Sequence, residues 1–231
     1  TQHRIDTSFI ERVPGADPVE SRITVTADGE RYVAFDDAPL ATTPMPNTAV
    51  VEAALSAATA LVIDACVAPP GSLRVVEQAR ERGVPVVLDA ERDPTPIVRA
   101  LVAAADHLVI PLSFGTMLTG ASDPADIAQE LWNDDRAVIV LTDGTRGAFA
   151  FDAPGTSVHV PSFAVTAVDT TGCGDAFHAA YAWSLLSDVG LPDRVSIASA
   201  AAAVIAAMPA GTQRVATREA IAVFVPGADL G

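Results

Sequence analysis

The chain has 231 residues, of which 50% are hydrophobic and 19% charged, a composition typical of a folded globular protein rather than of a disordered one. Its formal net charge of −15 disfavours nucleic acid or an anionic membrane surface as a partner and favours small molecules. The two cysteines give no disulfide framework and the first residues lack the apolar core of a signal peptide, so we expect a cytoplasmic protein.

The N-terminal part predicts a β hairpin, a loop and then a helix. Arg22–Ala27 and Arg31–Phe35 alternate or are β-branched, and an Asp-Gly-Glu sequence between them suits a tight turn. Prolines and aspartates then interrupt regular structure before an alanine-rich helix candidate at Thr48–Ala58.

From residue 60 onward, short β-branched runs alternate with longer amphipathic runs. Apolar strands between helices are typical of a parallel sheet with helices on both faces. Asp64 and Asp89 each follow a strand at the edge where such sheets bind ligands, but we interpret both as turn or cap residues. The expected strands are Leu61–Ile63, Val84–Leu88, Leu108–Ile110 and Ala137–Leu141, and the expected helices are Leu73–Arg82, Ile97–Ala104 and Ala125–Trp132.

The last third of the chain predicts two short strands and then helices. The strands are Phe149–Phe151 and Val158–Val160, and the helices are Cys173–Leu186, Asp193–Met208 and Thr217–Phe224. No internal repeat, low-complexity tract or linker interrupts the sequence, so we expect a single domain over residues 1–231.

The most informative stretch is D-T-T-G-C-G-D-A-F at Asp169–Phe177, a glycine-rich turn that leads into an apolar helix. Gly172 and Gly174 can take backbone angles closed to other residues, and the helix offers free N–H groups at its positive end, so an anion site is expected there. Asp175, in the first turn of this helix, suits a proton acceptor beside a phosphate. The same residues would also suit a plain connector with an acidic helix start.

This string resembles the C-terminal signature D-T-x-G-[AC]-G-D-x-F of the PfkB, or ribokinase-like, carbohydrate kinases. The resemblance implies a three-layer α/β/α sandwich that transfers the γ-phosphoryl group of ATP, with Mg²⁺, to a hydroxyl of a sugar or related polyol. It also implies that Asp175 is the catalytic base and that the amides of Gly172, Cys173 and Gly174 form an anion hole.

A second, weaker match lies in T-D-G-T-R-G, which is similar to the T-L-G-x-x-G segment that this family places against the nucleotide. It implies nucleotide contacts at Thr142, Gly144 and Gly147, although Asp143 stands where the family usually has an apolar residue. The resemblance further implies a monovalent cation, such as K⁺, behind the anion hole. The residues that it assigns to this cation are Asp169, Thr171, Ala206 and Gly211.

The chain departs from the family pattern in two places. Full members begin with a strand and a G-G-x-N-x-A-type segment that hold the sugar, and this chain starts after that point. We therefore expect an N-terminally incomplete kinase domain in which residues 22–35 are part of a substrate lid. The N-x-x-E motif expected near Ile110 is also missing, since residues 109–120 contain neither Asn nor a carboxylate, although Leu118-Thr119-Gly120 keeps the family's L-T-G ending. We expect weak nucleotide binding, poor or no sugar turnover, and self-association, for example as a homodimer, or low stability.

Other functions stay open at this point. A nucleoside kinase of the same fold is the nearest alternative, and a non-catalytic descendant that binds a nucleotide or sugar phosphate is another. A dinucleotide oxidoreductase is disfavoured because the turn lacks the third glycine of G-x-G-x-x-G. The four histidines show no metal-binding spacing, and we interpret His178 as a hydrogen-bonded helix residue and Cys173 as a small residue that presents its N–H.

Overall fold

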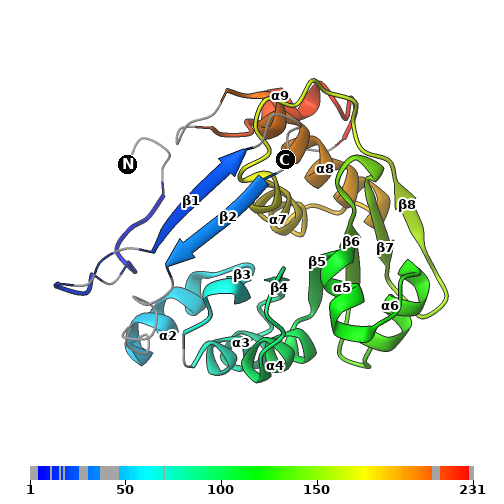
Figure 1. Ribbon diagram of the computed structural model, residues 1–231. Coiled ribbons are helices and arrows are strands. Elements are labelled where there is room, and N and C mark those ends of the chain that lie inside the picture. The colour runs from blue at the N-terminus through cyan, green and yellow to red at the C-terminus, as the bar shows by residue number, and fades with distance from the viewer. Residues whose placement is uncertain are drawn as a thin grey trace.

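A central sheet organises the computed structural model, which describes residues 5–10, 12–15, 17, 19–25, 31–36, 47–69, 71–209 and 214–228 (Figure 1). Among these residues its six strands lie in the order β3-β4-β5-β6-β7-β8. Neighbours from β3 to β6 are parallel, whereas β7 pairs antiparallel with β6 and β8 antiparallel with β7. The strands are β3 (Leu61–Asp64), β4 (Val86–Asp89), β5 (His107–Pro111), β6 (Val138–Thr142), β7 (Ala148–Phe151) and β8 (Val158–Val160).

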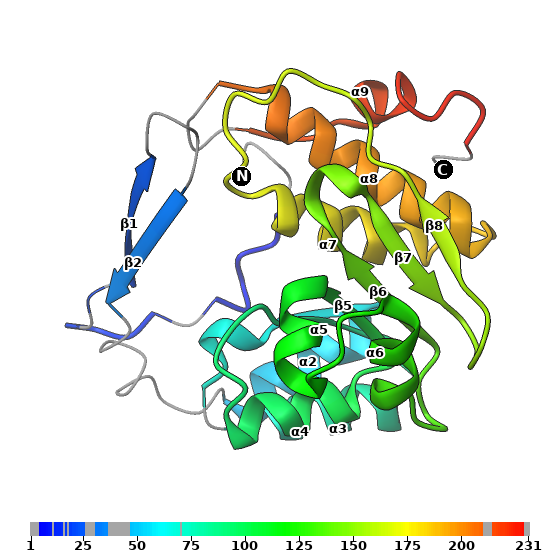
Figure 2. The same cartoon turned by 45° about the vertical axis from the view of Figure 1, so that its right-hand side comes forward.

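Helices cover both faces of this sheet, as Figures 1 and 2 show. One layer contains α2 (Thr48–Ala57), α3 (Ser72–Glu81), α4 (Pro96–Ala104), α5 (Leu112–Thr119) and α6 (Pro124–Leu131). The other contains α7 (Cys173–Ser184), α8 (Leu191–Ala207) and α9 (Arg218–Ala222). Short 3-10 helices, η1 (Ala65–Val67) and η2 (Gly144–Arg146), follow β3 and β6. The three-layer α/β/α fold predicted from the sequence is confirmed.

The side chains of the central strands explain why both faces need a helical layer. Successive side chains of a strand point to opposite faces of the sheet. In β5, Leu108 and Ile110 join the buried cluster that includes Phe114 of α5, whereas Val109 joins the cluster that includes Tyr181 of α7. Each strand therefore buries apolar surface on two sides, which accounts for the continuous apolar runs in the sequence.

Helix α5 lies where the sequence pattern predicts no helix. It begins directly after Pro111 and contains Gly115, a residue of low helix propensity. Tertiary packing compensates, because Phe114 is fully buried in the core. Gly115 also lets α6 approach closely, since a Cβ built on it would lie 2.8 Å from Cγ2 of Ile127. Packing rather than local propensity therefore forms this helix.

Helix α8 is the longest helix in the described part of the chain, with 17 residues, and it packs along α7. Its contact with α7 is made by small side chains such as Ala200 and Ala201, against Ala180 of α7. Within the described ranges, no helix combines the length and the apolar character that crossing a bilayer requires. The close pairing fixes the start of α7 next to the end of α8.

The predicted hairpin strands are β1 (Glu20–Val25) and β2 (Arg31–Asp36), which pair antiparallel and stand apart from the central sheet in both views (Figures 1 and 2). The expected Asp-Gly-Glu turn between them lies outside the described residues. The guanidinium carbon of Arg92, in the loop after β4, lies 3.6 Å from the ring centroid of Phe35. This cation–π contact holds β2 near the carboxyl end of β4. The lid role of residues 22–35 and the single-domain organisation stay predictions.

Candidate active site

The glycine-rich turn leads into α7, but only one of its two glycines needs the conformational freedom of glycine. Gly172 is the N-cap of α7 and has a left-handed φ of 78°. Gly174 lies within the first turn and is not among the described glycines with positive φ. A Cβ built on Gly174 would meet nothing within 4 Å. Only Gly172 therefore uses a backbone angle closed to other residues, while Gly174 leaves open space beside the helix start.

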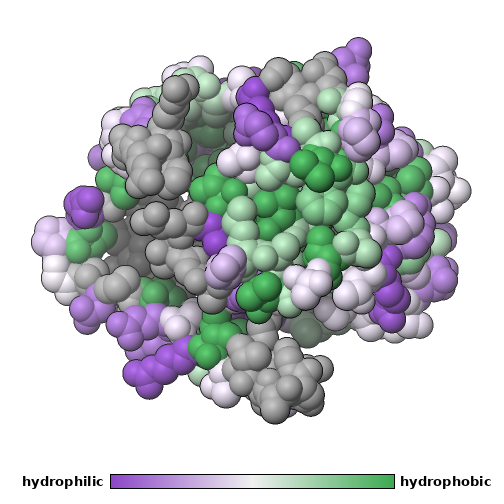
Figure 3. Space-filling view, turned by 90° about the horizontal axis from the view of Figure 1, so that it is seen from above, coloured by the Kyte–Doolittle hydropathy of each residue, from purple (hydrophilic) through white to green (hydrophobic). Residues whose placement is uncertain are grey.

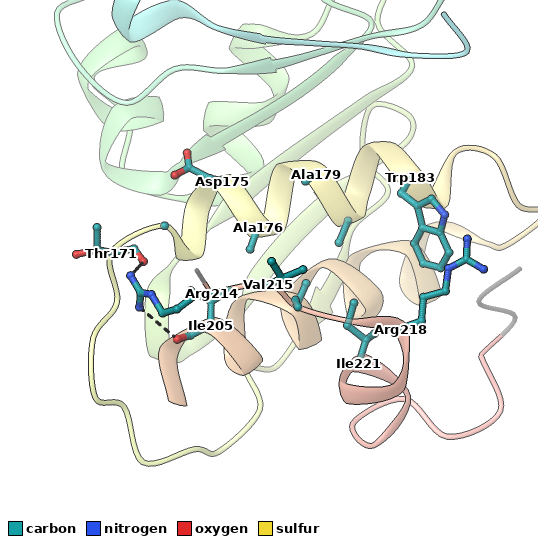
Figure 4. A pocket seen from close by; sticks show the side chains of 14 residues that line it. Thr171, Asp175, Ala176, Ala179, Trp183, Ile205, Arg214, Val215, Arg218 and Ile221 are labelled. Carbon is teal, nitrogen blue, oxygen red and sulfur yellow. Dashed lines mark hydrogen bonds between the residues drawn. The ribbon is translucent and has the colours of Figure 1, made fainter. Parts of the chain in front are cut away.

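Asp175 projects from the first turn of α7 and is exposed. In Figure 4 its carboxylate points away from Arg214 and Val215. The first N–H groups of the helix have no partner within the helix and carry the positive end of its dipole. An anion bound at these groups would therefore lie beside an accessible carboxylate.

Cys173 turns its side chain away from the turn. Its thiol donates to the carbonyl of Ala202 in α8 over 3.4 Å. Its N–H donates to the carbonyl of Thr170 over 3.2 Å, which closes the turn. Of the three amides expected to form the anion hole, the one at Cys173 thus has a partner within the protein.

A buried histidine ties the first turn of α7 to the ends of two strands. Nδ1 of His178 lies 2.8 Å from the carbonyl oxygen of Gly174 and 3.2 Å from Oδ2 of Asp89, and Nε2 lies 2.8 Å from the carbonyl oxygen of Val109. Because carbonyl oxygens only accept, a hydrogen bond to either carbonyl requires an N–H on the ring nitrogen that faces it. Burial raises the pKa of Asp89 to about 6 while His178 lowers it, so this carboxyl is ionised at neutral pH. Asp89 thus contacts His178 of α7 and is not only a cap residue.

Further carboxylates gather at the same edge of the sheet. The negative charges of Asp64, Glu91 and Asp175 add to the effect of burial in raising the pKa of Asp89. Asp64 also caps η1, since its Oδ1 accepts the N–H of Cys66 over 2.7 Å. In the part of the chain that the structure describes, no three His, Cys, Asp or Glu residues are arranged to hold a metal ion. The carboxylates of this acidic edge are hydrogen-bond acceptors when ionised.

The second predicted motif forms a separate hollow of about 550 Å³ at the ends of β5 and β6. Pro111 and Thr142 are partners in the register of these two strands. Gly147 has a φ of 94°, and a Cβ there would collide with the carbonyl oxygen of Val160 at the end of β8. Gly144 has a φ of 53° but faces open space. The lining residues are Pro111, Leu112, Ser113, Thr116, Thr142, Asp143, Gly144, Thr145 and Arg146.

Two features distinguish this hollow from the family pattern. Asp143, which replaces an apolar residue, is held by Arg146 over 2.6 Å from Nε to Oδ2. The segment without N-x-x-E forms the opposite wall, to which α5 contributes the hydroxyl residues Ser113 and Thr116 but no carboxylate. Any Mg²⁺ in this hollow would therefore depend on the nucleotide phosphates and not on α5.

The glycine-rich turn of residues 169–174 is called the anion turn below. A groove of about 630 Å³ runs along α7 from this turn (Figure 4). Its wall is apolar at Ala179 and Trp183, and polar at the end where Thr171 and Arg214 meet. Figure 3 looks down on the layer of α7, α8 and α9 and shows hydrophobic residues gathered there. The lining residues are Thr171, Gly172, Asp175, Ala176, Ala179, Ala180, Trp183, Ala201, Ile205, Arg214, Val215, Ala216, Arg218 and Ile221.

The oxygens that the resemblance assigns to a monovalent cation meet an arginine instead. Arg214 donates to the carbonyl of Thr171 over 2.6 Å and to that of Asp169 over 3.0 Å. The carbonyl of Ala206 accepts the N–H of Val168 over 2.7 Å. Gly211 lies outside the described residues. These contacts do not fit the expected metal ion, because a guanidinium already bonds its oxygens.

Comparison with known proteins decides the family. The family model described as pfkB family carbohydrate kinase matches residues 1–216. The chain belongs to the pfkB family. In this pfkB protein the glycine-rich turn and Asp175 lie together at the start of α7, while Thr142 and Gly144 lie in the neighbouring hollow.

Several proteins are similar to this pfkB chain. The bifunctional protein HldE of Pseudomonas putida (strain GB-1) is 24% identical over 197 residues, which cover 81% of this chain and 41% of HldE. A crystal structure from Agrobacterium tumefaciens, assigned as a ribokinase, has a TM-score of 0.77 at 27% identity and covers 90% of this chain and 67% of its own. The ribokinase of Arabidopsis thaliana, solved with ribose and ATP, has a TM-score of 0.74 at 21% identity, and the match covers 90% of this chain and 69% of the ribokinase chain. The chain thus spans about two fifths of the bifunctional relative.

Arg214 and the pairing of His178 with Asp89 are the features that the sequence pattern did not predict. Arg214 carries only a weak signal, as a single basic residue shortly after the loop assigned to the cation. Asp89 and His178 are both visible in the sequence, but their contact joins residues far apart in the chain.

Proposed function

We propose that this pfkB protein transfers the γ-phosphoryl group of ATP to a hydroxyl of an uncharged sugar or related polyol. The observation that carries the proposal is the exposed carboxylate of Asp175 at the positive end of α7, three residues after the left-handed Gly172 and next to the open space at Gly174. A phosphoryl group held at the helix start would lie next to a group that can accept the proton of an attacking hydroxyl.

The chemical step divides between these residues. Asp175 accepts the hydroxyl proton while the acceptor oxygen bonds to phosphorus and the bond to ADP breaks. The N–H groups at the start of α7 stabilise the charge that spreads over the phosphoryl oxygens. Mg²⁺ bound to the nucleotide would neutralise part of the phosphate charge. Thr142 and Gly144 hold the nucleotide in the hollow at the ends of β5 and β6, where Gly144 leaves room for close approach.

The acidic edge supports a neutral acceptor. Asp64, Glu91 and Asp175 all lie near Asp89, since the charge of each acts on its carboxyl group. Carboxylates accept strong hydrogen bonds from sugar hydroxyls. They repel a substrate that is itself an acid or a phosphate ester, because both carry negative charge. The hairpin held by Arg92 and Phe35 lies beside this edge and would cover the acceptor.

Two alternatives have specific support. A nucleoside kinase would use the same base and the same acidic edge for ribose hydroxyls. A non-catalytic binding protein is supported by the wall of α5, which offers hydroxyls but no carboxylate for metal handling. The chain also covers only 41% of the bifunctional relative, so the activity of the whole protein is part of the proposal.

The test is a panel of acceptors with ATP, followed by ADP release in a coupled assay and by calorimetric titration of the nucleotide. The panel contains neutral sugars and polyols, nucleosides, and sugar acids of matched size. We expect ADP release with at least one neutral sugar or polyol and none with the matched acid. Nucleotide binding without turnover of any acceptor would favour the non-catalytic alternative, and a preference for nucleosides would favour the nucleoside kinase.

A further inference from the structure

A cluster of oxygen atoms lies directly behind the anion turn. It contains the carboxylate of Asp169 and the main-chain carbonyls of Asp169, Thr171 and Ile205. Oδ1 of Asp169 also accepts the N–H of Thr171 over 2.8 Å, which folds this segment back on itself. Carboxylate and carbonyl oxygens that converge in this way attract a cation.

The guanidinium of Arg214 occupies this cluster. Nη2 lies 2.6 Å from the Thr171 oxygen and 3.3 Å from Oδ2 of Asp169, while Nη1 lies 3.0 Å from the Asp169 carbonyl oxygen and 3.5 Å from that of Ile205. The side chains of Arg214 and Asp169 are only 12% and 20% exposed. Figure 4 shows the Arg214 side chain reaching Thr171 and Ile205. The guanidinium stays charged at all accessible pH values and has the five donors needed to serve several oxygens together.

We propose that Arg214 is a built-in cation that takes the place of a bound monovalent metal ion, so that the anion turn of this protein works without added K⁺. A metal ion among the same oxygens would face the positive charge of the guanidinium in a partly buried space, where like charges repel strongly. The donors of Arg214 are also directed at the oxygens that would coordinate the ion.

The position of Arg214 connects this charge to the proposed chemistry. It bonds the carbonyl of Thr171, the residue immediately before the left-handed Gly172 that opens α7. It therefore fixes the entry of the turn and adds positive charge behind the amides that would bind the phosphoryl group. The link to catalysis rests on the proposed function, whereas the occupation of the cation site does not.

The first experiment measures the unfolding temperature of the unaltered protein in KCl, NaCl and choline chloride at equal ionic strength. We expect the same unfolding temperature in all three salts, and the same ADP affinity by calorimetry. A saturable rise in unfolding temperature with K⁺ but not with choline would overturn the proposal. This result does not depend on phosphoryl transfer, so failure of the proposed function leaves it unaffected.

The second experiment compares Arg214→Ala, Arg214→Lys and Arg218→Ala in the same salts. Arg214→Ala should weaken ADP binding about tenfold or more, because it removes charge-assisted hydrogen bonds, and K⁺ should restore part of its stability. Arg214→Lys keeps the charge and should stay insensitive to K⁺. Arg218, which lies over the ring of Trp183 at 5.0 Å, is the matched control and its variant should not respond to K⁺.

Each outcome of this comparison supports or contradicts the proposal that Arg214 takes the place of a monovalent metal ion. An Arg214→Ala chain that folds only in K⁺ supports the proposal, since the ion then replaces the lost charge. An Arg214→Ala chain as stable as the unaltered protein in choline, or an Arg214→Lys chain that K⁺ stabilises, would contradict it. If Arg214→Ala does not fold in any salt, the unaltered protein and Arg214→Lys still give the answer. If activity is found and K⁺ raises it severalfold in the unaltered protein, the built-in cation is wrong while the kinase function stands.

Discussion

Gly172 and Gly174 are two residues apart but have different physical roles, which a pair of alanine variants can separate. Gly172→Ala places a side chain at a φ of 78°, so we expect a loss of about 1 kcal/mol or more in the free energy of unfolding. Gly174→Ala enters a helical position with open space around it, so stability should change by about 1 kcal/mol or less. Denaturant titration of both variants measures the difference.

We expect ADP affinity to rank the two variants in the opposite order. If the phosphates bind at the start of α7 as proposed, the methyl group of Gly174→Ala would enter the space that they occupy, so ADP affinity should fall although the fold is intact. If Gly174→Ala kept full ADP affinity, the open space at this position would have no role in binding. Equal stability of the two variants would show that the left-handed angle at Gly172 carries no cost.

His178 and His107 offer a matched comparison of two buried histidines. Both ring nitrogens of His178 face carbonyl oxygens, whereas Nδ1 of His107 lies 3.1 Å from the hydroxyl of Tyr181, which can donate or accept. Burial lowers the pKa of His107 to about 4. At neutral pH we expect ¹⁵N NMR to show the widely separated nitrogen shifts of a neutral ring for His107. An imidazolium pattern for His107 would contradict its burial as a neutral group.

The loop between β6 and β7 contains two glycines, Gly144 and Gly147, that differ in the space available for a side chain. A side chain on Gly147 would collide with the main chain after β8, so Gly147→Ala should detach the loop and cost about 2–4 kcal/mol. Gly144→Ala has free space and is the matched control, with a cost of about 1 kcal/mol from its positive φ. Thermal unfolding of both variants tests this, and equal stability would show that the loop is not anchored on β8.

The elements and their order could be predicted from the sequence, whereas several contacts could not. The central strands β4, β5 and β6 are apolar runs in the sequence because helices cover both faces of the sheet there, and the predicted bounds of the six strands agree with the structure within about two residues. Helix α5 escaped prediction because Gly115 and the start after Pro111 argue against a helix, whereas burial of Phe114 in the core and close packing against α6 favour it. Arg214 escaped prediction because its partner Thr171 lies 43 residues earlier in the chain.

For the whole molecule, burial of His107 sets a pH dependence of stability. Its pKa falls from 6.5 to about 4 on folding, mainly through burial, with Arg194 and Arg136 adding to the decrease and Asp106 opposing it. The unfolded chain therefore binds a proton first as the pH falls from 6.5, and stability should be lost down to about pH 4, by roughly 3 kcal/mol. Asp89 has the opposite effect. Its pKa is raised from 3.8 to about 6 in the folded protein, so the folded state binds the proton more tightly and stability falls as the pH rises from 3.8 to about 6.

These two effects oppose each other between pH 4 and 6, so the unaltered protein should show a weaker pH dependence than either group alone. His107→Gln removes one of them. We expect the stability of this variant relative to the unaltered protein to rise steadily as the pH falls from 6.5 to about 4. Urea titrations at several pH values give this difference directly, and a constant difference would show that His107 is not a neutral buried group.

The most direct test of the account is the turnover of Asp175→Asn beside that of Asp193→Asn. Both residues are acids in the first turn of a helix, Asp175 in α7 and Asp193 in α8, so the two changes have similar effects on helix electrostatics. With the best acceptor of the panel, Asp175→Asn should lower phosphoryl transfer by about 10²–10⁴-fold and leave ADP affinity within a few-fold, because it removes a base and keeps the turn. Asp193→Asn should retain its turnover. An Asp175→Asn protein that kept most of its activity would contradict the assignment of Asp175 as the catalytic base.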